Sequence, residues 1–409
     1  MSDCRACGTA LRHSFCDLGT APPSNAFLRA EQLNGTERFY PLHALVCDSC
    51  WLVQIEVFEA PQQIFTDEYV YFSSYSETWL AHARSYVDAV SARFALGDNH
   101  RVVEIASNDG YLLQYFTARG VPVLGIEPAA NVARAAEQKG VSTRVEFFSA
   151  ACAGRLAAEG IAADLIVANN VLAHVPSPND FVEGIQVLLA PGGVATLEFP
   201  HLLRLIEHNQ FDTIYHEHFS YFSLLAAERL LAAHRLRVFD VEELPTHGGS
   251  LRLYVCPAAA RSYEGGARLA KVRADERQAA LHSLDGYQGF QSGVRETKRA
   301  LIEILSAAKH DGRRVAGYGA AAKGNTLLNY CGVRGDMIDY VADLSPHKQG
   351  RFLPGSHIPV VPPERVRETR PDLLLVLPWN IKEEIMAQNA CIRGWGGRFL
   401  IPIPHPQVI

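Results

Sequence analysis

An apolar strand that runs through a turn of small residues into a helix is the feature that most restricts how this chain can fold. The strand spans Arg101 to Ile105, and the turn reads Ala106-Ser107-Asn108-Asp109-Gly110. A second apolar strand, Val123 to Ile126, follows one helix length later and ends in Glu127-Pro128. Strands that alternate with helices form a doubly wound parallel sheet, whose ligands bind at the carboxyl ends of the strands. The sequence therefore predicts an α/β fold with a ligand site beside this turn.

The chemistry of this turn indicates which cofactor it binds. A dinucleotide site needs glycines that seat a pyrophosphate on a helix N-terminus, whereas this turn is acidic. An acidic turn repels phosphate and attracts ammonium, and S-adenosylmethionine carries an amino group and a ribose but no phosphate. We therefore expect S-adenosylmethionine, with Glu127 accepting the ribose hydroxyls. The candidate cofactor residues are Glu104, Ala106, Asn108, Asp109, Gly110, Glu127, Pro128, Phe148, Ser149, Asn169 and Asn170.

Later segments extend the same sheet. A third strand, Asp164 to Ala168, ends in Asn169-Asn170, and the turn Leu189-Ala190-Pro191-Gly192-Gly193 leads into a fourth. Class I methyltransferases commonly carry a Pro-Gly-Gly turn before a strand. A helix is expected from Glu77 to Phe94, because Trp79, Tyr86 and Val90 are spaced for one helical face.

Two Cys-x-x-Cys pairs near the N-terminus indicate a metal site. Cys4 pairs with Cys7 and Cys47 with Cys50, and this set offers the four thiolates that a tetrahedral structural zinc ion requires. A single redox pair would not need the second one, and Cys16 and His13 are less favoured ligands. The segment from Gly19 to Phe27 between the pairs is read as a rigid turn that faces a neighbouring domain.

Length and charge exclude some classes of function. A chain of 409 residues is expected to form two or three domains. A net charge of −6, without a long basic run, argues against a nucleic-acid surface and against an anionic membrane surface. The sequence has neither a secretion signal nor an apolar stretch long enough to span a bilayer, so a cytoplasmic protein is expected.

The segment from Tyr215 to Ser223 concentrates acid/base side chains. It contains His216, Glu217 and His218 between tyrosines, which favours proton-transfer chemistry. A buried aromatic turn with structural histidines is the alternative. Spacing does not decide whether His216 or His218 faces a ligand.

A second glycine turn lies near the C-terminus. The run from Gly317 to Thr326 resembles a strand, a turn and a helix start, and it carries Lys323. Backbone amides at a helix N-terminus and a lysine ammonium suit a phosphate group. A duplicated domain that has lost its ligand is the alternative.

Motifs along nearly the whole chain carry a resemblance to a known family. They are the Cys pairs, the Val-Glu-Ile-x-x-Asn-Asp-Gly turn, Glu127-Pro128, Phe147-Phe148, Asn170 to His174, the Tyr-x-Glu-His element at Tyr215, His247-Gly248-Gly249 and Gly317 to Ala320. On these motifs the chain resembles the nucleotide-sugar 3-C-methyltransferases that make branched deoxysugars, such as those of tetronitrose and mycarose biosynthesis. It departs from the family at Ala106, where glycine is usual, and around Ser73-Ser74-Tyr75 and Phe199-Pro200-His201.

The resemblance implies a chain of three parts. These are a small zinc-binding module at residues 1–65, a class I methyltransferase Rossmann-like domain at 66–255, and a region at 256–409 that consists of a helical linker and a C-terminal Rossmann-like α/β domain. The last part is expected to help hold the diphosphate of a nucleotide sugar. The residues expected to bind this substrate are His247, Gly248, Arg252, Tyr318, Gly319, Lys323, Asn325, Lys348, Arg351 and His357.

The same resemblance implies methylation at C-3 of a dTDP-linked 4-keto-deoxysugar by a monomeric enzyme. A base would remove the C-3 proton to give an enolate, and His218 is the first candidate for this base. Glu217 would orient it, and hydroxyl donors would stabilise the oxygen at C-4. The candidate catalytic residues are His218, Glu217, Tyr215, Tyr69, Tyr71 and His174.

Three other functions fit parts of the pattern. A methyltransferase acting on oxygen or nitrogen would use the same cofactor and could use the same histidine. A nicotinamide-dependent oxidoreductase would use the C-terminal glycine turn, with Asp343 as the acid for the ribose. A non-catalytic scaffold that recruits partners through its zinc module would have no activity.

Overall fold

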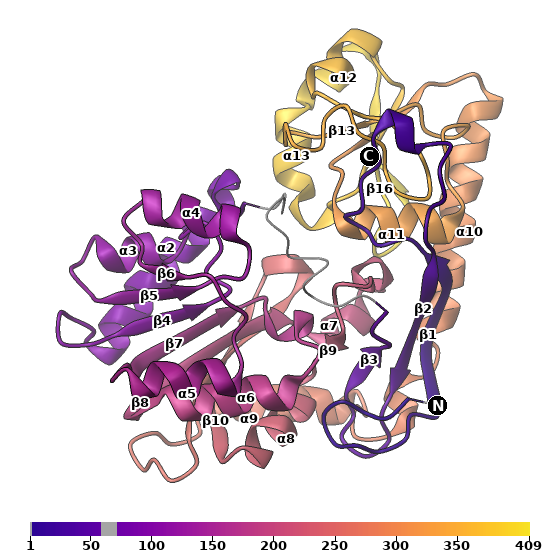
Figure 1. The fold of residues 1–409 in the computed structure, drawn as a ribbon. Helices are drawn as coiled ribbons and strands as arrows, with labels where there is room; N and C mark the ends of the chain where they lie inside the picture. Colours follow the sequence, from indigo (N-terminus) through magenta and orange to yellow (C-terminus); the bar gives the residue numbers. More distant parts are fainter. Residues whose placement is uncertain (1, 59–71) are drawn as a thin grey trace.

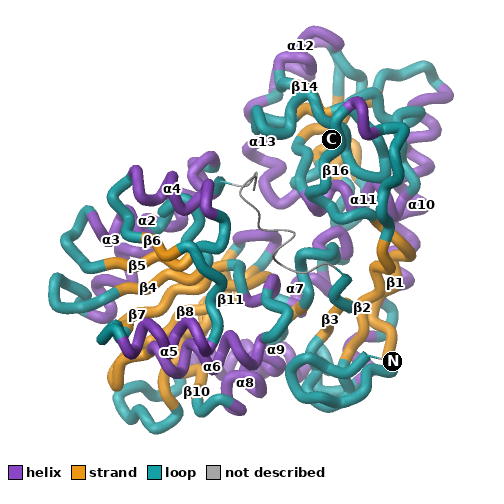
Figure 2. Tube along the Cα trace, in the orientation of Figure 1, coloured by secondary structure: helices purple, strands orange, loops and turns teal. Residues whose placement is uncertain are grey.

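The protein folds around three β-sheets (Figure 1). The computed structural model describes residues 2–58 and 72–409. The sheets contain four, seven and six strands. Figure 2 shows that helices flank the sheets of the methyltransferase and C-terminal domains. This mixed α/β architecture confirms the predicted fold class. The predicted boundary at residue 65 lies outside the described residues, and no helix within them is both long and apolar enough to cross a membrane.

The seven-stranded sheet forms the centre of the methyltransferase domain. Its order is β10-β11-β8-β7-β4-β5-β6. The strands from β8 to β6 are parallel, whereas β11 lies antiparallel between β8 and β10. One antiparallel strand inserted near the edge of an otherwise parallel sheet is the class I methyltransferase arrangement. The strands are β4 (Val102–Ile105), β5 (Val123–Ile126), β6 (Thr143–Arg144), β7 (Ala163–Asn169), β8 (Leu189–Pro200), β10 (Leu236–Leu244) and β11 (Ser250–Pro257).

Helices cover both faces of this sheet because the strands are apolar on both sides. Buried residues of α2, α3 and α4 join one hydrophobic cluster, and those of α5, α6, α8 and α9 join another. Helix α2 has the predicted bounds, and its first turn is capped by Ser76, whose hydroxyl accepts from Trp79 N. The helices are α2 (Glu77–Phe94), α3 (Leu113–Thr117), α4 (Ala130–Gln138), α5 (Ala150–Ala158), α6 (Pro178–Leu188), α7 (Leu202–Glu207), α8 (Leu224–Ala233) and α9 (Ala267–Gln278).

The N-terminal sheet is completed by a strand from the middle of the chain. Strands β1 (His13–Ala21), β2 (Tyr40–Val46) and β3 (Val53–Ile55) pair in order, and β9 (Ser220–Tyr221) pairs with β3. In Figure 1, β1 and β2 extend along one side of the molecule from the N-terminus toward the C-terminal domain. Strand β1 reaches Ala21, so the turn expected from Gly19 begins only after Ala21. The segment of the Tyr-x-Glu-His element thus belongs structurally to two domains.

The C-terminal domain is a second, mainly parallel sheet. Its order is β14-β13-β12-β15-β16-β17, with only the β16–β17 pair antiparallel. The long helix α10 lies beside β1 (Figure 1), and Phe15 stacks on Phe290 at 4.6 Å between ring centroids. The elements are α10 (Phe290–His310), β12 (Val315–Tyr318), α11 (Ala322–Cys331), β13 (Val341–Ala342), β14 (Val360–Val361), α12 (Glu364–Thr369), β15 (Leu373–Val376), α13 (Lys382–Gln388), β16 (Arg398–Ile401) and β17 (Gln407–Val408).

The turn after β4 holds two non-glycine residues in a left-handed conformation. Ala106 has φ 55° and Asn108 has φ 49°. Asparagine tolerates this region, whereas the Cβ of alanine is crowded there. The departure from glycine at position 106 therefore costs conformational free energy in the folded state.

We predict that Ala106→Gly increases the free energy of unfolding by about 1 kcal/mol, because glycine adopts this φ without strain. Chemical denaturation without cofactor would measure the change. The matched control is Ala133→Gly in the buried face of α4, which should decrease the free energy of unfolding by about 1 kcal/mol or more. A loss of stability in Ala106→Gly comparable to the control would contradict the prediction.

Candidate active site

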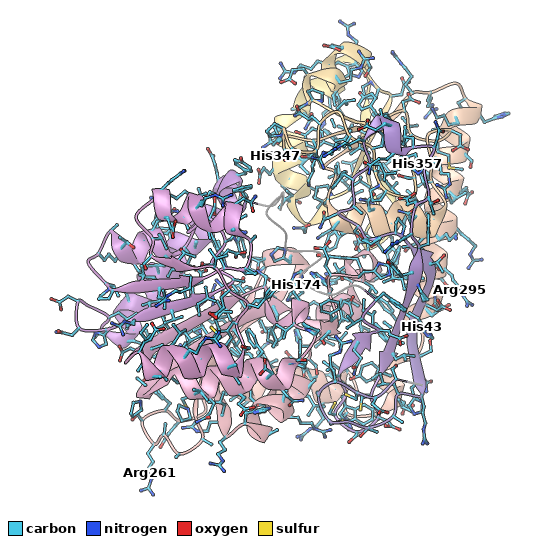
Figure 3. The ribbon with its side chains drawn as sticks, viewed as in Figure 1. His43, His174, Arg261, Arg295, His347 and His357 are labelled. Atoms are coloured by element: carbon cyan, nitrogen blue, oxygen red, sulfur yellow. The ribbon has the colours of Figure 1, made fainter. Side chains whose placement is uncertain are left out.

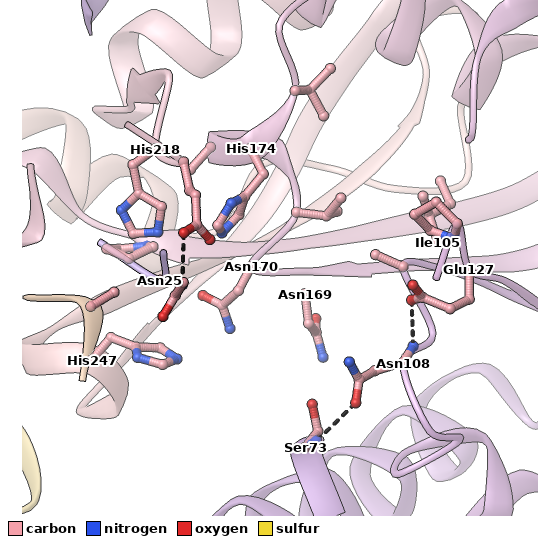
Figure 4. Close-up of a pocket in the computed structure, with 18 of the residues that line it drawn as sticks. Asn25, Ser73, Ile105, Asn108, Glu127, Asn169, Asn170, His174, His218 and His247 are labelled. Carbon is pink, nitrogen blue, oxygen red and sulfur yellow. Dashed lines mark hydrogen bonds between the residues drawn. The ribbon is translucent and has the colours of Figure 1, made fainter. Parts of the chain in front are cut away.

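A cavity of 620 Å³ opens at the carboxyl ends of the central strands. Its walls come from the methyltransferase domain, from the segment around residue 215 and from the start of α11, and one N-terminal side chain, Asn25, joins them. His174 lies near the middle of the molecule in Figure 3. Figure 4 shows His218, His174, His247 and Asn25 at one end, and Glu127 with Asn108 at the other.

Glu127 forms the acidic end of the cavity. Its carboxylate accepts from Asn108 N at 3.0 Å and from Ala129 N at 2.9 Å, which fixes its orientation at the end of β5. Burial raises the pKa of Glu127 to about 7. Ser73 N donates to the side-chain oxygen of Asn108 at 2.8 Å and closes this end. A ribose that donates hydroxyl hydrogen bonds would favour the ionised carboxylate.

Two asparagines at the end of β7 carry polar atoms without protein partners. Within the described part of the chain, Asn169 Oδ1 and both amide atoms of Asn170 are buried and make no hydrogen bond. Buried polar atoms normally have partners, so these atoms are suited to a bound ligand. Together with Glu127, Phe148 and Ser149, which also line the cavity, they fit a nucleoside bearing an amino-acid tail.

His218 is held in one tautomer. Its Nδ1–H donates to the carbonyl of Thr213 at 3.0 Å, so Nε2 is the basic nitrogen and accepts from the hydroxyl of Tyr215 at 2.7 Å. Burial, followed by the effect of His174, lowers the pKa of His218 well below its ordinary value. His218 is therefore neutral at neutral pH. The His174 ring lies 4.6 Å away, and burial lowers the pKa of His174 to about 4.

The structure distinguishes the two histidines of the Tyr-x-Glu-His element. His218 lines the cavity, whereas His216 does not. The Nε2–H of His216 donates to Pro41 O at 3.2 Å, and its ring lies against Tyr40. The hydroxyl of Tyr215, a candidate donor to the oxygen at C-4, donates to His218 in this structure.

The cationic end of the cavity is held by a cluster from two domains. Lys323 Nζ donates to Asn380 Oδ1 at 2.7 Å and lies 4.7 Å from the centre of the Trp379 ring. Trp379 Nε1 donates to Asp212 Oδ2 at 2.7 Å. Burial, then the charge of Lys323, lowers the pKa of His247 to about 4, so Lys323 is electrostatically coupled to the imidazoles.

Several residues predicted to bind the substrate lie outside the cavity, and three of them have defined protein partners. Arg252 is buried between Glu198 and Glu242, and although burial opposes ionisation, His82 and Arg252 hold the pKa of Glu198 at about 2. Asn325 is buried in α11 and donates to Ser24 O at 2.6 Å. His357 pairs with Glu37 at 2.9 Å. Their positions indicate structural roles, because each side chain is committed to the protein.

Other predicted residues support the cavity or lie apart from it. Glu104 is buried beneath the cofactor turn, and burial raises its pKa well above the ordinary value. Tyr69 and Tyr71 lie outside the described residues. The predicted residues that line the cavity are Ala106, Asn108, Glu127, Pro128, Phe148, Ser149, Asn169, Asn170, His174, Tyr215, Glu217, His218, His247, Lys323 and Lys348. The predicted residues that do not are Glu104, Asp109, Gly110, Gly248, Arg252, Tyr318, Gly319, Asn325, Arg351 and His357.

The C-terminal glycine turn leaves little room for a dinucleotide. A Cβ at Gly319 would lie 2.4 Å from Pro378 Cγ, so the turn is packed against protein. The carboxylate of Asp343 accepts from Ala320 N at 2.6 Å and from Ser345 N at 2.8 Å. The two oxygens of Asp343 thus bond backbone amides in the same way as those of Glu127. The close packing of Gly319 against Pro378 is the observation that argues against the oxidoreductase alternative.

Some cavity residues were not found from the sequence. Asn25, Trp79 and Asn380 line the cavity, and none was a candidate. The Pro22-Pro23 turn was a usable signal for Asn25, because it was expected to face another domain. Trp79 was assigned to one helical face, and the sequence did not decide which aromatic residues of this segment pack in the core and which line a pocket.

The four cysteines of the N-terminal module are arranged for a metal. Their sulfur atoms all lie within 4.8 Å of one another, with 3.5 Å between Cys4 and Cys50 and between Cys7 and Cys47. Zinc–sulfur bonds of about 2.3 Å give a tetrahedron with edges of about 3.8 Å, so the set fits a structural zinc ion. Cys16 is fully buried in the core, and His13 bonds Asp48.

The sheet order and the cavity at its carboxyl edge define a class I methyltransferase with a zinc-binding module. Comparison with family models agrees: a zinc binding domain matches residues 4–65, a methyltransferase domain 79–240, and a C-methyltransferase C-terminal domain 245–404. The chain is 36% identical over 409 residues to C-methyltransferase NovU of Streptomyces niveus, covering 100% of this chain and 97% of that protein. The chain therefore belongs to this C-methyltransferase family. Its cofactors are S-adenosylmethionine and structural zinc, as predicted.

More distant likenesses cover less than half of the chain. The ubiquinone biosynthesis O-methyltransferase of Leptothrix cholodnii is 28% identical over 99 residues, which is 24% of this chain and 42% of that protein. Magnesium protoporphyrin IX methyltransferase from Synechocystis, solved with bound S-adenosylmethionine, is 15% identical with a TM-score of 0.33. That match covers 44% of this chain and 81% of the other.

We predict that the affinity for S-adenosylhomocysteine falls as the pH drops below about 7, because Glu127 becomes protonated there. Calorimetric titrations at about pH 6 and about pH 8 would measure this change. Glu127→Gln should bind at least tenfold more weakly at the higher pH and lose this pH dependence. Glu137→Gln, an exposed change on α4, is the control and should match the wild type. Equal wild-type affinity at both pH values would contradict the assignment.

We further predict that the purified protein contains equimolar zinc, and that Cys47→Ser abolishes zinc retention. Because a structural metal contributes folding free energy, this variant should also unfold at a lower temperature. Elemental analysis and thermal unfolding are the measurements. Cys16→Ala is the control, since Cys16 lies in the core outside the cluster and its loss should leave the zinc content unchanged. Zinc loss in both variants would count against the four-cysteine site.

Proposed function

We propose that this protein transfers a methyl group from S-adenosylmethionine to C-3 of a nucleotide-linked 4-keto-deoxysugar. The observation that carries the proposal is a neutral imidazole, His218, in the same cavity as the cofactor site. Methylating carbon requires a carbanion equivalent, and a ketone supplies one when a base removes the neighbouring proton. A dTDP-linked sugar, a monomeric enzyme and a cytoplasmic location remain predictions.

The proposed proton acceptor is the pair formed by Tyr215 and His218. The Tyr215 hydroxyl donates to Nε2, so one route passes the C-3 proton to the tyrosine oxygen as the tyrosine proton moves to His218. In the other route the hydroxyl turns aside and Nε2 takes the proton directly. Both routes leave an imidazolium, whose Nδ1–H remains bonded to Thr213 O. Bound S-adenosylmethionine supplies an electrophilic methyl group on a sulfonium sulfur.

The proposed stabiliser of the enolate oxygen is the ammonium of Lys323. Lys323 lines the cavity with His218 and His247 and is half-buried; burial lowers its pKa, whereas the charge of Asp212 raises it. A cation partly withdrawn from water acts strongly on a developing negative charge. The sequence predicts a diphosphate contact for this lysine. Its coupling to both imidazoles favours a place near the reacting carbon.

The proposed diphosphate site lies further along the same wall. Ala321 and Ala322 at the start of α11 line the cavity, as does Lys348. Lys348 Nζ donates to Ala320 O at 2.9 Å and lies 3.9 Å from Asp343, so it is held near this helix start. A helix N-terminus and a lysine together favour phosphate oxygens.

Methylation of an oxygen or nitrogen acceptor is the second candidate, since a base next to the cofactor could also activate a hydroxyl or an amine. Incubation with isotopically labelled S-adenosylmethionine and a panel of nucleotide-linked keto-sugars tests both. A labelled methyl on C-3, located by NMR, supports the proposal. A labelled methyl on oxygen or nitrogen, or no product from any sugar, overturns it.

We predict that His218→Asn lowers kcat by about 10²- to 10⁴-fold, because the proton acceptor is lost. Affinity for S-adenosylhomocysteine should stay within about twofold, since His218 lies at the opposite end of the cavity from Glu127. His216→Asn is the control: His216 lies outside the cavity, so the folded protein should keep its turnover. Similar losses of turnover in the two variants would contradict the assignment.

A further inference from the structure

One residue of the N-terminal module reaches into the active-site cavity. Among the described residues before position 59, Asn25 alone lines it. Its side-chain Nδ2 donates to Glu217 Oε1 at 2.7 Å, across 192 residues of sequence. Figure 4 shows this contact beside His218 and His174.

The turn that carries Asn25 is anchored on the C-terminal domain. Asn325 of α11 donates to the backbone carbonyl of Ser24, the residue before Asn25, at 2.6 Å, and this contact is buried. Two residues later, the Phe27 ring lies 5.6 Å from Lys348 Nζ, and Leu28 forms a backbone bridge with Phe352. The turn is therefore fixed on both sides of Asn25, and its amide is presented to the cavity in one position.

The partner of Asn25 lies in the segment that carries the acid/base pair. Glu217 is buried and lies between Tyr215 and His218 in sequence, and all three side chains line the cavity. A charge-assisted hydrogen bond from an amide is short and directional, and it restricts the rotation of a carboxylate. Preorganised groups contribute to catalysis because they need no reorganisation when charge develops.

We propose that Asn25 is a positioning residue, which fixes the carboxylate of Glu217 so that it holds a sugar hydroxyl of the substrate next to His218. The zinc-binding module thereby completes the active site. The identity of the substrate rests on the proposed function, but the coupling between Asn25 and Glu217 does not depend on which acceptor is methylated.

A double-mutant cycle on the full-length zinc-loaded enzyme tests this coupling. Asn25→Ala should lower kcat about 10- to 100-fold, the range expected for a hydrogen bond to a charged group, with KM for S-adenosylmethionine unchanged. Glu217→Ala should lower kcat as well. In the double variant, the loss should equal that of Glu217→Ala alone, because Asn25 acts through Glu217.

The matched control is Asn179→Ala. The Asn179 amide of α6 donates to Arg5 O and Ala6 O at 3.0 Å, so it also joins the N-terminal module to the methyltransferase domain, but Asn179 does not line the cavity. Its loss should affect thermal stability and leave kcat unchanged. Wild-type turnover in Asn25→Ala, additive losses in the cycle, or an equal drop of kcat in Asn179→Ala would overturn the inference. If the wild-type enzyme methylates no keto-sugar, the proposed function fails instead.

Discussion

The segment from Ile214 to Phe219 forms hydrogen bonds with all three parts of the chain, and the geometry of the active site depends on these bonds. Phe219 N donates to Ala173 O at 2.8 Å in the methyltransferase domain, and Ile55 N donates to Phe219 O at 3.1 Å from the N-terminal sheet. From the C-terminal domain, the Thr326 hydroxyl donates to Ile214 O at 3.2 Å. Because the backbone is fixed on both sides of Tyr215, the carbonyl of Thr213 can hold the His218 ring in one tautomer.

Burial and charge then divide the cavity into two ends. Glu127, whose pKa burial raises to about 7, makes one end acidic. The half-buried Lys323, whose pKa burial lowers and the charge of Asp212 raises, makes the other end cationic. The imidazoles lie with Lys323, where burial and the nearby cation keep them unprotonated. A sulfonium and an ammonium are favoured at the first end and an anion at the second, where the unprotonated imidazoles can accept a proton. This distribution of charge would suit the proposed reaction of a cationic methyl donor with an enolate.

The features that could be predicted from the sequence are those determined by interactions between residues close together in the chain. The β4 strand, its turn, helix α2 and the cysteine pairs follow from hydrophobic periodicity, capping and ligand spacing, each readable within a few residues. Contacts between segments that lie far apart in the sequence could not be predicted in this way. Arg252 follows a glycine turn and looked like a ligand, but strand register places it opposite Glu198 on β8 and Glu242 on β10. Asn25 was missed because the adjacent Pro22-Pro23 turn indicates a contact with another domain but not the partner, which lies 192 residues away.

The four cysteines of the zinc site lie outside the active-site cavity, so the metal can act on that cavity only through the structure of its module. The metal ligands lie at one end of the N-terminal sheet, near the N-terminus in Figure 1, and β1 leads away from them toward the C-terminal domain. A structural metal adds fixed cross-links to a module whose strands also pack into a hydrophobic core shared with the C-terminal domain. Strand β1 then leads into the Pro22-Pro23 turn, which holds Asn25 at a defined position in the cavity wall. A flexible arm would lose conformational entropy each time it placed the amide against Glu217, whereas a metal-braced strand has lost that entropy on folding.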